Sequence, residues 1–182
     1  MAPPAVPVRD RRHLLDRPAA ALPHGFAFRA VGLADPLARP LLEGLAHEYQ
    51  HGLGHPAEAV RRELAAAPAA DFEAPRGCLL VVLHEGRPVA GGGYRRQTGR
   101  SAELKRIWTA PTHRRLGLGR AVVAELERRA AAAGCTSIHL SSGVRQHAAH
   151  RLYRASGYVP GAQPLPGPGS DPVLRFAKAL AA

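Results

Sequence analysis

Apolar residues recur along the chain at regular spacings, and these spacings predict alternating strands and helices. A period of two residues indicates a strand with one buried face, and a period near 3.6 indicates an amphipathic helix. Proline and glycine clusters separate the segments. The predicted strands cover residues 26–30, 78–84, 89–94, 102–109, 137–141 and 173–177. The predicted helices cover residues 35–49, 56–64, 118–133 and 147–155.

The order of these elements predicts one α/β domain over residues 25–182. The strands between residues 78 and 109 follow one another through short turns and so form antiparallel hairpins. Helix 118–133 lies between two strands, as in a crossover connection. We therefore expect a mixed, mostly antiparallel sheet with flanking helices and a proline- and glycine-rich loop over 160–172. Residues 1–24 contain five prolines and no long apolar run, so they predict a disordered tail.

The composition fits a folded protein without a membrane span. The hydrophobic fraction is 46% and the charged fraction 21%, which argues against disorder throughout the chain. The longest apolar runs, such as residues 78–83, are far shorter than the roughly 20 residues that span a bilayer. Cys78 and Cys135 lie within apolar runs, so we expect buried thiols and a cytoplasmic location rather than a disulfide framework.

The formal net charge of +11 is unevenly distributed along the chain. Residues 33–76 contain 4 basic and 7 acidic side chains, a net charge of −3, whereas residues 103–154 contain 10 and 3, a net charge of +7. The second segment is therefore expected to meet an anion, and the first segment a cation.

The segment that says most about function is Glu103–Arg120, where a predicted strand runs into a turn that opens the long helix. Glycines in such a turn let the backbone approach a ligand closely, and the amides of the first helical turn favour a phosphate group. The spacing Arg-x-x-Gly-x-Gly fits neither a Walker A loop nor a dinucleotide fingerprint. The candidate pyrophosphate-binding residues are Arg114, Arg115, Leu116, Gly117, Leu118, Gly119 and Arg120.

A second motif follows downstream. Residues 149–158 read Ala-His-Arg-Leu-Tyr-Arg-Ala-Ser-Gly-Tyr. Together with the glycine-containing turn, they resemble the acetyl-coenzyme A (acetyl-CoA) binding region of the GNAT family of N-acetyltransferases. The motif agreement covers residues 103–158, and the elements before it come in a matching order. The resemblance implies the GNAT acyl-CoA N-acyltransferase fold with a splayed strand pair, acetyl-CoA as cosubstrate, no metal, and direct acetyl transfer within a ternary complex.

The resemblance also implies roles for single residues. The same turn would hold the pyrophosphate, and the main chain of Ile107, Trp108 and Thr109 would pair with the pantetheine arm where two strands splay apart. Tyr153 matches the tyrosine that lies near the thioester sulfur in the family. The family commonly has asparagine where this chain has Gln146, whose longer side chain alters that pantetheine contact. A homodimer is common in the family.

Acetyl transfer to an amine requires two proton transfers, which point to further candidates. An alkyl amine with a pKa near ~10 must lose a proton before it attacks, and a thiolate leaving group with a pKa near ~8.5 benefits from an acid. Tyr153 is the candidate acid. Glu103 stands where several members of the family carry a catalytic glutamate, and it is the candidate base, directly or through water. His139 and His147 are the alternatives.

Glu48 and Tyr49 are the candidate acceptor-binding residues. In the family, the helices after the first strand form one wall of the acceptor pocket. In this chain that wall is the acidic segment. The resulting hypothesis is an acceptor that is a small primary amine or otherwise cationic.

Two other functions are compatible with parts of the sequence. The pattern His47-Glu48-x-x-His51, on a helix, would place two imidazoles for zinc and a glutamate as base, as in a metalloprotease. Gly52 follows at once and interrupts such a helix. A basic nucleic-acid-binding module is the other alternative. It is disfavoured because coenzyme A phosphates account for the +7 segment and aromatic residues are not interleaved with its basic ones.

Overall fold

The computed structural model describes residues 21–52, 54–65, 67–167 and 171–180. The strands are β1 (Phe26–Val31), β2 (Gly77–His84), β3 (Arg87–Arg96), β4 (Ser101–Thr109), β5 (Ser137–Gly143), β6 (Val159–Pro160) and β7 (Val173–Ala179). The main helices are α1 (Arg39–His47), α2 (Ala57–Ala65), α3 (Leu118–Ala132) and α4 (His147–Ala155). Short helical turns are η2 (Pro36–Ala38), η3 (Glu48–Gly52), η4 (Ala69–Phe72) and η5 (Pro111–His113).

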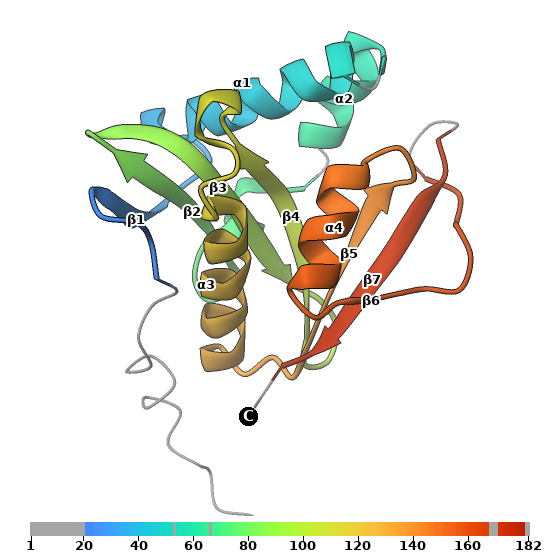
Figure 1. Cartoon of the computed structure of the whole chain (residues 1–182). Helices are drawn as coiled ribbons and strands as arrows, with labels where there is room; N and C mark the ends of the chain where they lie inside the picture. Colours follow the sequence, from blue (N-terminus) through green and yellow to red (C-terminus); the bar gives the residue numbers. More distant parts are fainter. Residues whose placement is uncertain (1–20, 53, 66, 168–170, 181–182) are drawn as a thin grey trace, which may run out of the picture.

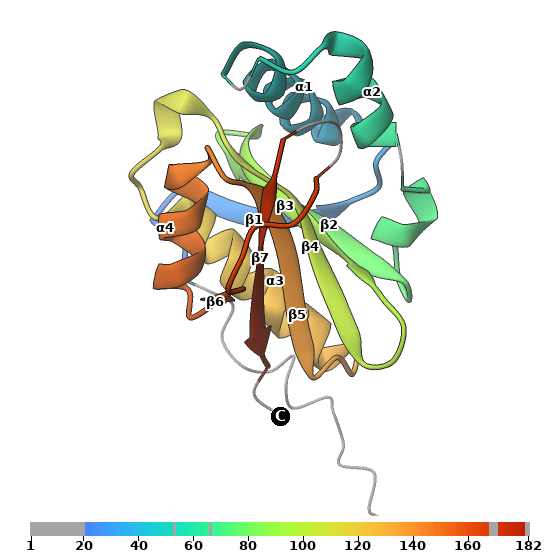
Figure 2. The ribbon, with the colours of Figure 1, turned by 90° about the vertical axis from the view of Figure 1, so that its right-hand side faces the viewer.

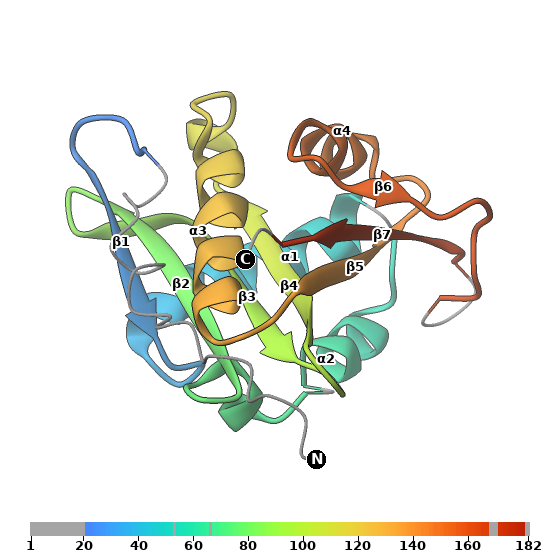
Figure 3. The same ribbon diagram turned by 90° about the horizontal axis from the view of Figure 1, so that it is seen from below.

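The seven strands form one sheet in the order β1-β2-β3-β4-β5-β7-β6 (Figure 1). The pairs β1–β2, β2–β3, β3–β4, β5–β7 and β6–β7 are antiparallel. Strands β4 and β5 form a parallel pair, connected through α3. This confirms the predicted mixed, mostly antiparallel sheet with one crossover. Seen from below (Figure 3), α3 and α4 lie on one side of the sheet and α2 on the other.

The two faces of the sheet carry separate cores. On the opposite face from α3, α1 packs Leu41 and Leu45 against Trp108 of β4. This contact is close, since a Cβ atom at Gly44 would lie 2.2 Å from Trp108 Nε1. The larger core lies between the sheet and helices α3 and α4, and its buried residues include Leu80, Leu104, Val122, Leu126, Leu140 and Phe176.

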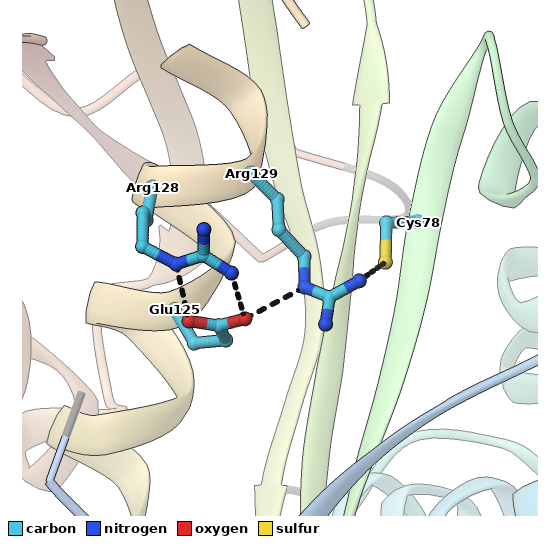
Figure 4. A network of polar contacts seen from close by, with 4 residues as sticks. All are labelled: Cys78, Glu125, Arg128 and Arg129. Atoms are coloured by element: carbon cyan, nitrogen blue, oxygen red, sulfur yellow. Dashed lines mark hydrogen bonds and ion pairs between the residues drawn. The ribbon is translucent and has the colours of Figure 1, made fainter. Parts of the chain in front are cut away.

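A buried carboxylate anchors α3 to the sheet. Glu125 is 1% exposed and accepts hydrogen bonds from Arg128 Nε and Nη2 at 2.8 and 2.7 Å and from Arg129 Nε at 2.8 Å (Figure 4). Arg129 Nη1 also lies 4.0 Å from Cys78 Sγ, so the network reaches β2. Burial alone would raise the pKa of Glu125, but the hydrogen bonds from Arg128 and Arg129 lower it overall.

We expect Glu125→Gln to lower the free energy of unfolding by about 2 kcal/mol, since a hydrogen bond to a charged group contributes roughly 1.5–3 kcal/mol. A carboxyl whose folded pKa is lowered stabilises the protein above its unfolded pKa and loses this contribution as the pH falls through the folded pKa. The effect of the substitution should therefore shrink in acid. Urea unfolding at several pH values measures it.

The matched control is Glu58→Gln, which removes an exposed pair between Glu58 and Arg61. Exposed ion pairs contribute little, so this variant should lose less than about 1 kcal/mol. Equal losses in the two variants would contradict the assigned role of Glu125.

Most predicted elements differ from the observed ones by one or two residues at their ends, and three regions differ in kind. The helix predicted for residues 35–49 consists of three pieces, η2, α1 and the wider π turn η3. The break between η2 and α1 arises because Pro40 lacks the amide that would continue one helix into the other. The predicted loop from residue 160 includes Pro160, which ends the edge strand β6. Leu22, within the predicted tail, packs against the larger core. Residues 1–20 of that tail lie outside the described residues.

In the part of the chain that is described, no helix combines the length and the apolar character needed to cross a membrane.

Candidate active site

Strands β4 and β5 part in the middle of the sheet. Their parallel ladder has three register pairs and ends where Glu103 meets His139. Beyond this pair, β4 continues to Thr109 and β5 to Gly143 without pairing with each other. We call this gap between residues 104–109 and 140–143 the strand opening; Figure 2 shows the two strands below α1 and α2. Backbone groups along such an edge can pair with an extended ligand.

A bulge in β4 lies at the start of the strand opening. The register between β3 and β4 changes from Gly93 opposite Lys105 to Gly91 opposite Trp108, so β4 holds one extra residue. Arg106 takes the left-handed φ of +61° within this bulge. Bulges bend a strand and increase its twist, which here accompanies the separation of β4 from β5.

The side chain of Arg106 fixes the bulge against α2. It is buried, and its guanidinium carbon lies 4.2 Å from the centroid of the Phe72 ring. Its Nη2 donates a hydrogen bond to the carbonyl oxygen of Leu64. Helix α2 is therefore bonded directly to β4, the strand that borders the opening.

The turn between β4 and α3 has a backbone suited to an anion. Gly117 is the N-cap of α3 with a φ of +80°, and Arg115 has a φ of +69°. Left-handed residues in such a turn direct successive amides toward one point, and the first turn of a helix adds amides without an intrahelical acceptor. A Cβ atom on Gly117 would meet no described atom within 4 Å, which leaves room for a ligand. The turn thus fits the predicted pyrophosphate.

Arg114 and Glu48, predicted for the cofactor and the acceptor respectively, form one ion pair in the structure. Arg114 Nε also donates to the carbonyl oxygen of Thr109 at 3.3 Å. Burial raises the pKa of Glu48, and Arg114 opposes this shift. The pair links η3 to the turn before α3. Tyr49 packs against the small core of α1, and its ring centroid lies 6.1 Å from that of His55.

Tyr153 and Gln146 lie at the two ends of α4. Tyr153 is 7% exposed, and its ring centroid is 5.6 Å from that of Phe176. Burial raises the pKa of Tyr153, so its hydroxyl stays protonated at neutral pH. Gln146 Oε1 accepts hydrogen bonds from Gly143 N at 3.0 Å and Ser142 Oγ at 2.7 Å. The side-chain oxygen of Gln146 therefore closes the turn that follows β5.

Three donors hold the carboxylate of Glu103. Its Oε2 accepts hydrogen bonds from Arg95 Nε at 2.8 Å and Gln97 Nε2 at 3.1 Å, and its Oε1 lies 3.3 Å from Lys105 Nζ. Burial alone would raise the pKa of Glu103, but Lys105 and Arg95 lower it overall. A carboxylate stabilised in this way is a weak proton acceptor.

His139 lies opposite Glu103 in the last register pair before the strands part. Its side chain is half-buried, and burial lowers the pKa of His139 despite the opposing charge of Glu103. The imidazole is therefore neutral near pH 7 and can accept a proton. His147, the other predicted alternative, is exposed at the start of α4.

The His47-Glu48-x-x-His51 pattern gives no metal centre among the described residues. The rings of His47 and His51 stack with centroids 4.4 Å apart, and the carboxylate of Glu48 is paired with Arg114. In the described ranges, no group of three or more His, Cys, Asp or Glu side chains could hold a metal ion.

The two cysteines have the properties of core thiols. Cys135 is buried and Cys78 is half-buried beside Arg129. Burial raises the pKa of both thiols, so they stay protonated and weakly nucleophilic at neutral pH.

The parted parallel strands, the turn suited to an anion and the buried tyrosine on α4 form the kind of site that an acyltransferase with an extended, phosphorylated acyl carrier requires. The family model described as the acetyltransferase (GNAT) family matches residues 41–158, which is more than half of the chain. The chain belongs to this family and is an acetyl-CoA-dependent N-acetyltransferase. A search of curated proteins gave no match.

Several solved structures share the fold. An acetyltransferase from Streptococcus agalactiae is 18% identical with a TM-score of 0.68, covering 86% of this chain and 99% of that one. The ribosomal-protein-S18-alanine N-acetyltransferase from Escherichia coli is 18% identical with a TM-score of 0.62, covering 86% and 95%. The protein yncA from Salmonella typhimurium, solved with acetyl-CoA, is 19% identical with a TM-score of 0.64, covering 86% and 95%. At these identities the likeness shows the fold.

We expect Gly117→Ala to weaken acetyl-CoA binding about 5–10-fold, because a left-handed alanine costs roughly 1–2 kcal/mol and the turn would relax out of its ligand-binding shape. Isothermal titration calorimetry measures the Kd. Gly99→Ala is the matched control, since Gly99 has a φ of +71° with equal space around it but lies in the turn between β3 and β4. Equal weakening by both substitutions would contradict a specific role for the turn at Gly117.

Sequence reasoning missed the donors around Glu103. Arg95 and Gln97 reach it because the short turn between β3 and β4 places Arg95 opposite Glu103. The turn Thr98-Gly99-Arg100 was the available signal, since counting outward from its centre pairs residue 95 with residue 103. The left-handed Arg106 had no comparable signal, because arginine has no preference for such a conformation.

Proposed function

We propose that this N-acetyltransferase moves the acetyl group directly onto a primary amine of a small acceptor within a ternary complex. The observation that carries the proposal is the strand opening, whose closed end lies at Glu103 and His139 and whose strand β4 leads into the turn at Gly117. A thioester bound along the opening would supply an activated acetyl group at that end. The acceptor nitrogen forms the new bond to the acetyl carbon as the carbon–sulfur bond breaks.

In this proposal His139 is the general base and Glu103 is a positioning residue. The sequence alone favoured Glu103 as the base. Its contacts with Arg95 and Lys105 favour an indirect role instead, in which the negative charge of Glu103 stabilises the protonated imidazole. The half-buried neutral imidazole of His139 supports the assignment of the base.

Tyr153 is the proposed acid, which protonates the leaving sulfur. Its hydroxyl remains protonated over the whole neutral range because burial raises the pKa of Tyr153. Direct transfer is supported by the two cysteines, because the pKa of each thiol is raised by burial and neither offers a ready thiolate for a covalent intermediate.

The remaining site residues are proposed as binding groups. Glu48 and Tyr49, both in η3, are proposed to contact the acceptor, and the side-chain oxygen of Gln146 closes the turn after β5. The proposed main-chain contacts to acetyl-CoA come from Ile107, Trp108, Thr109, Arg115, Leu116, Gly117, Leu118, Gly119 and Arg120. A cytoplasmic location and a homodimer stay predictions, which fractionation and sedimentation velocity test.

The proposed function is tested by measuring thiol release from acetyl-CoA over a panel of amino acids, polyamines, aminoglycosides and arylamines. Mass spectrometry must show an N-acetylated product in step with the released thiol. A chelator in the same assay should leave the rate unchanged. Binding of acetyl-CoA without acetylation of any amine would overturn the proposal.

We expect Glu103→Gln to lower kcat about 10-fold and to move the acid limb of the pH profile to lower pH. The shift follows because Glu103 raises the pKa of His139, so removing its charge lowers that pKa further. Glu85→Gln, in the exposed turn between β2 and β3, is the control and should change neither quantity. An acid limb that stays in place in Glu103→Gln would contradict the coupling.

A further inference from the structure

One side of β5 and β7 is open beside the closed end of the strand opening. Residues along both strands alternate between a buried side and an exposed side. The buried side faces α4, where the Phe176 ring centroid lies 5.3 Å from that of His150. The exposed side holds Ser137, Ser141, Arg175, Ala177 and Ala179. Its side chains are mostly small, so a ligand can approach the closed end from this side.

The strand register gathers charged side chains on this same side. Arg95, Glu103 and His139 stand opposite one another on β3, β4 and β5. Lys105 follows two residues after Glu103, and Arg175 lies two residues from the position on β7 that faces His139. We call Arg95, Glu103, Lys105, His139 and Arg175 the basic face.

The basic face has an excess of positive charge. With His139 neutral, its formal charges are three positive and one negative, and the negative charge of Glu103 is already bound to Arg95 and Lys105. Among the ion pairs between described residues, none involves Arg175. The pKa of His139 reflects these charges. Burial lowers this pKa and Glu103 raises it, and the charges of Arg175, Lys105 and Arg95 lower it further.

Two acidic side chains, Glu48 and Asp171, already have cationic partners. Glu48 forms its ion pair with Arg114. Asp171 Oδ2 lies 2.6 Å from Arg145 Nη2 and 3.0 Å from His55 Nε2. The pairing of Glu48 leaves less negative charge for an acceptor than the net charge of −3 over residues 33–76 indicates, and the excess positive charge near His139 complements an anion.

We propose that the acceptor is a small amine that also carries a carboxylate, as an amino acid does, with the carboxylate at Lys105 and Arg175 and the amine at His139. The inference rests on the proposed transfer to an amine at this end of the opening. As the nitrogen–carbon bond forms and the carbon–sulfur bond breaks, His139 takes one amine proton and Tyr153 protonates the leaving sulfur. Solvent then carries the proton from His139 back to Tyr153.

The first test compares amino acids with their amides in the thiol-release assay, because the amide keeps the amine and lacks the negative charge. We expect kcat/KM to be at least about 10-fold higher for the acids.

Lys105→Gln and Arg175→Gln should each raise the KM of the amino acid about 10-fold and leave the KM of acetyl-CoA and of the amide unchanged. Arg29→Gln, an exposed arginine on β1 at the far edge of the sheet, is the control. Equal or better rates with the amides would overturn the proposal.

A binding measurement separates this inference from the proposed function. N-acetylated amino acids and their amides are titrated calorimetrically into the protein saturated with coenzyme A. Carboxylate-dependent binding that weakens about 10-fold in Lys105→Gln, even without turnover of any amine, would support the basic face and overturn acetyl transfer to an amine. Turnover of an amine together with equal binding of the acid and the amide would support acetyl transfer to an amine and overturn the role of the basic face.

Discussion

Replacement of His139 by glutamine is expected to lower kcat about 10²-fold and to leave the Kd of acetyl-CoA unchanged, since a positioned general base contributes about 10²–10⁴-fold. Glutamine keeps much of the size and hydrogen-bonding capacity of histidine but accepts no proton at neutral pH. In the wild-type protein, kcat should fall in acid with a midpoint below the ordinary histidine pKa of ~6.5, because burial lowers the pKa of His139. The rate falls in acid because a general base accepts a proton only in its deprotonated form. This acid limb should be absent from His139→Gln.

The matched control is His147→Gln, which removes an exposed imidazole from the start of α4. It should keep both the rate and the acid limb. An acid limb that persists in His139→Gln but disappears in Glu103→Gln would return the role of base to Glu103.

Replacement of Tyr153 by phenylalanine is also expected to lower kcat about 10²-fold, because the thiolate then leaves without an acid. Phenylalanine keeps the ring that packs against Phe176, so the fold and the acetyl-CoA Kd should not change. Thiol release under saturating acetyl-CoA and acceptor measures kcat directly.

The control for Tyr153→Phe is Tyr158→Phe. Tyr158 is also buried, and the two ring centroids are 5.9 Å apart. Tyr158→Phe removes a hydroxyl from the same cluster of buried rings. If kcat depends on the proton that Tyr153 donates, Tyr158→Phe should change kcat less than about threefold. Equal losses in the two variants would assign both tyrosines to packing.

The secondary structure was predictable where burial is periodic. Helix α3 was found from Leu118, Val122 and Leu126, which recur every fourth residue and are all buried in the larger core. Strand β6 was missed because two residues, one of them Pro160, give no periodic signal. The first helix was predicted as continuous because apolar spacing does not register the break at Pro40.

The candidate site was predictable where chemistry follows local sequence. The turn at Gly117 stands between a predicted strand and a predicted helix, and that context predicted a turn suited to a phosphate; in the structure Gly117 is the left-handed N-cap of α3. Pairing between distant residues was not predictable. The ion pair of Arg114 and Glu48 joins positions far apart in the sequence, and it neutralises a charge that a segment average counted as available to an acceptor. Averages over a segment ignore such pairing, so the net charge of residues 33–76 overstates the negative charge that is open to an acceptor.

Direct transfer in a ternary complex is tested most directly by initial rates over a grid of acetyl-CoA and acceptor concentrations, with the best amine from the panel. Both substrates must be bound together before the acetyl group moves, so reciprocal plots at different acceptor concentrations should give lines that intersect. Parallel lines, with an acetylated protein detected by mass spectrometry when acetyl-CoA is supplied alone, would show a covalent intermediate and contradict the account.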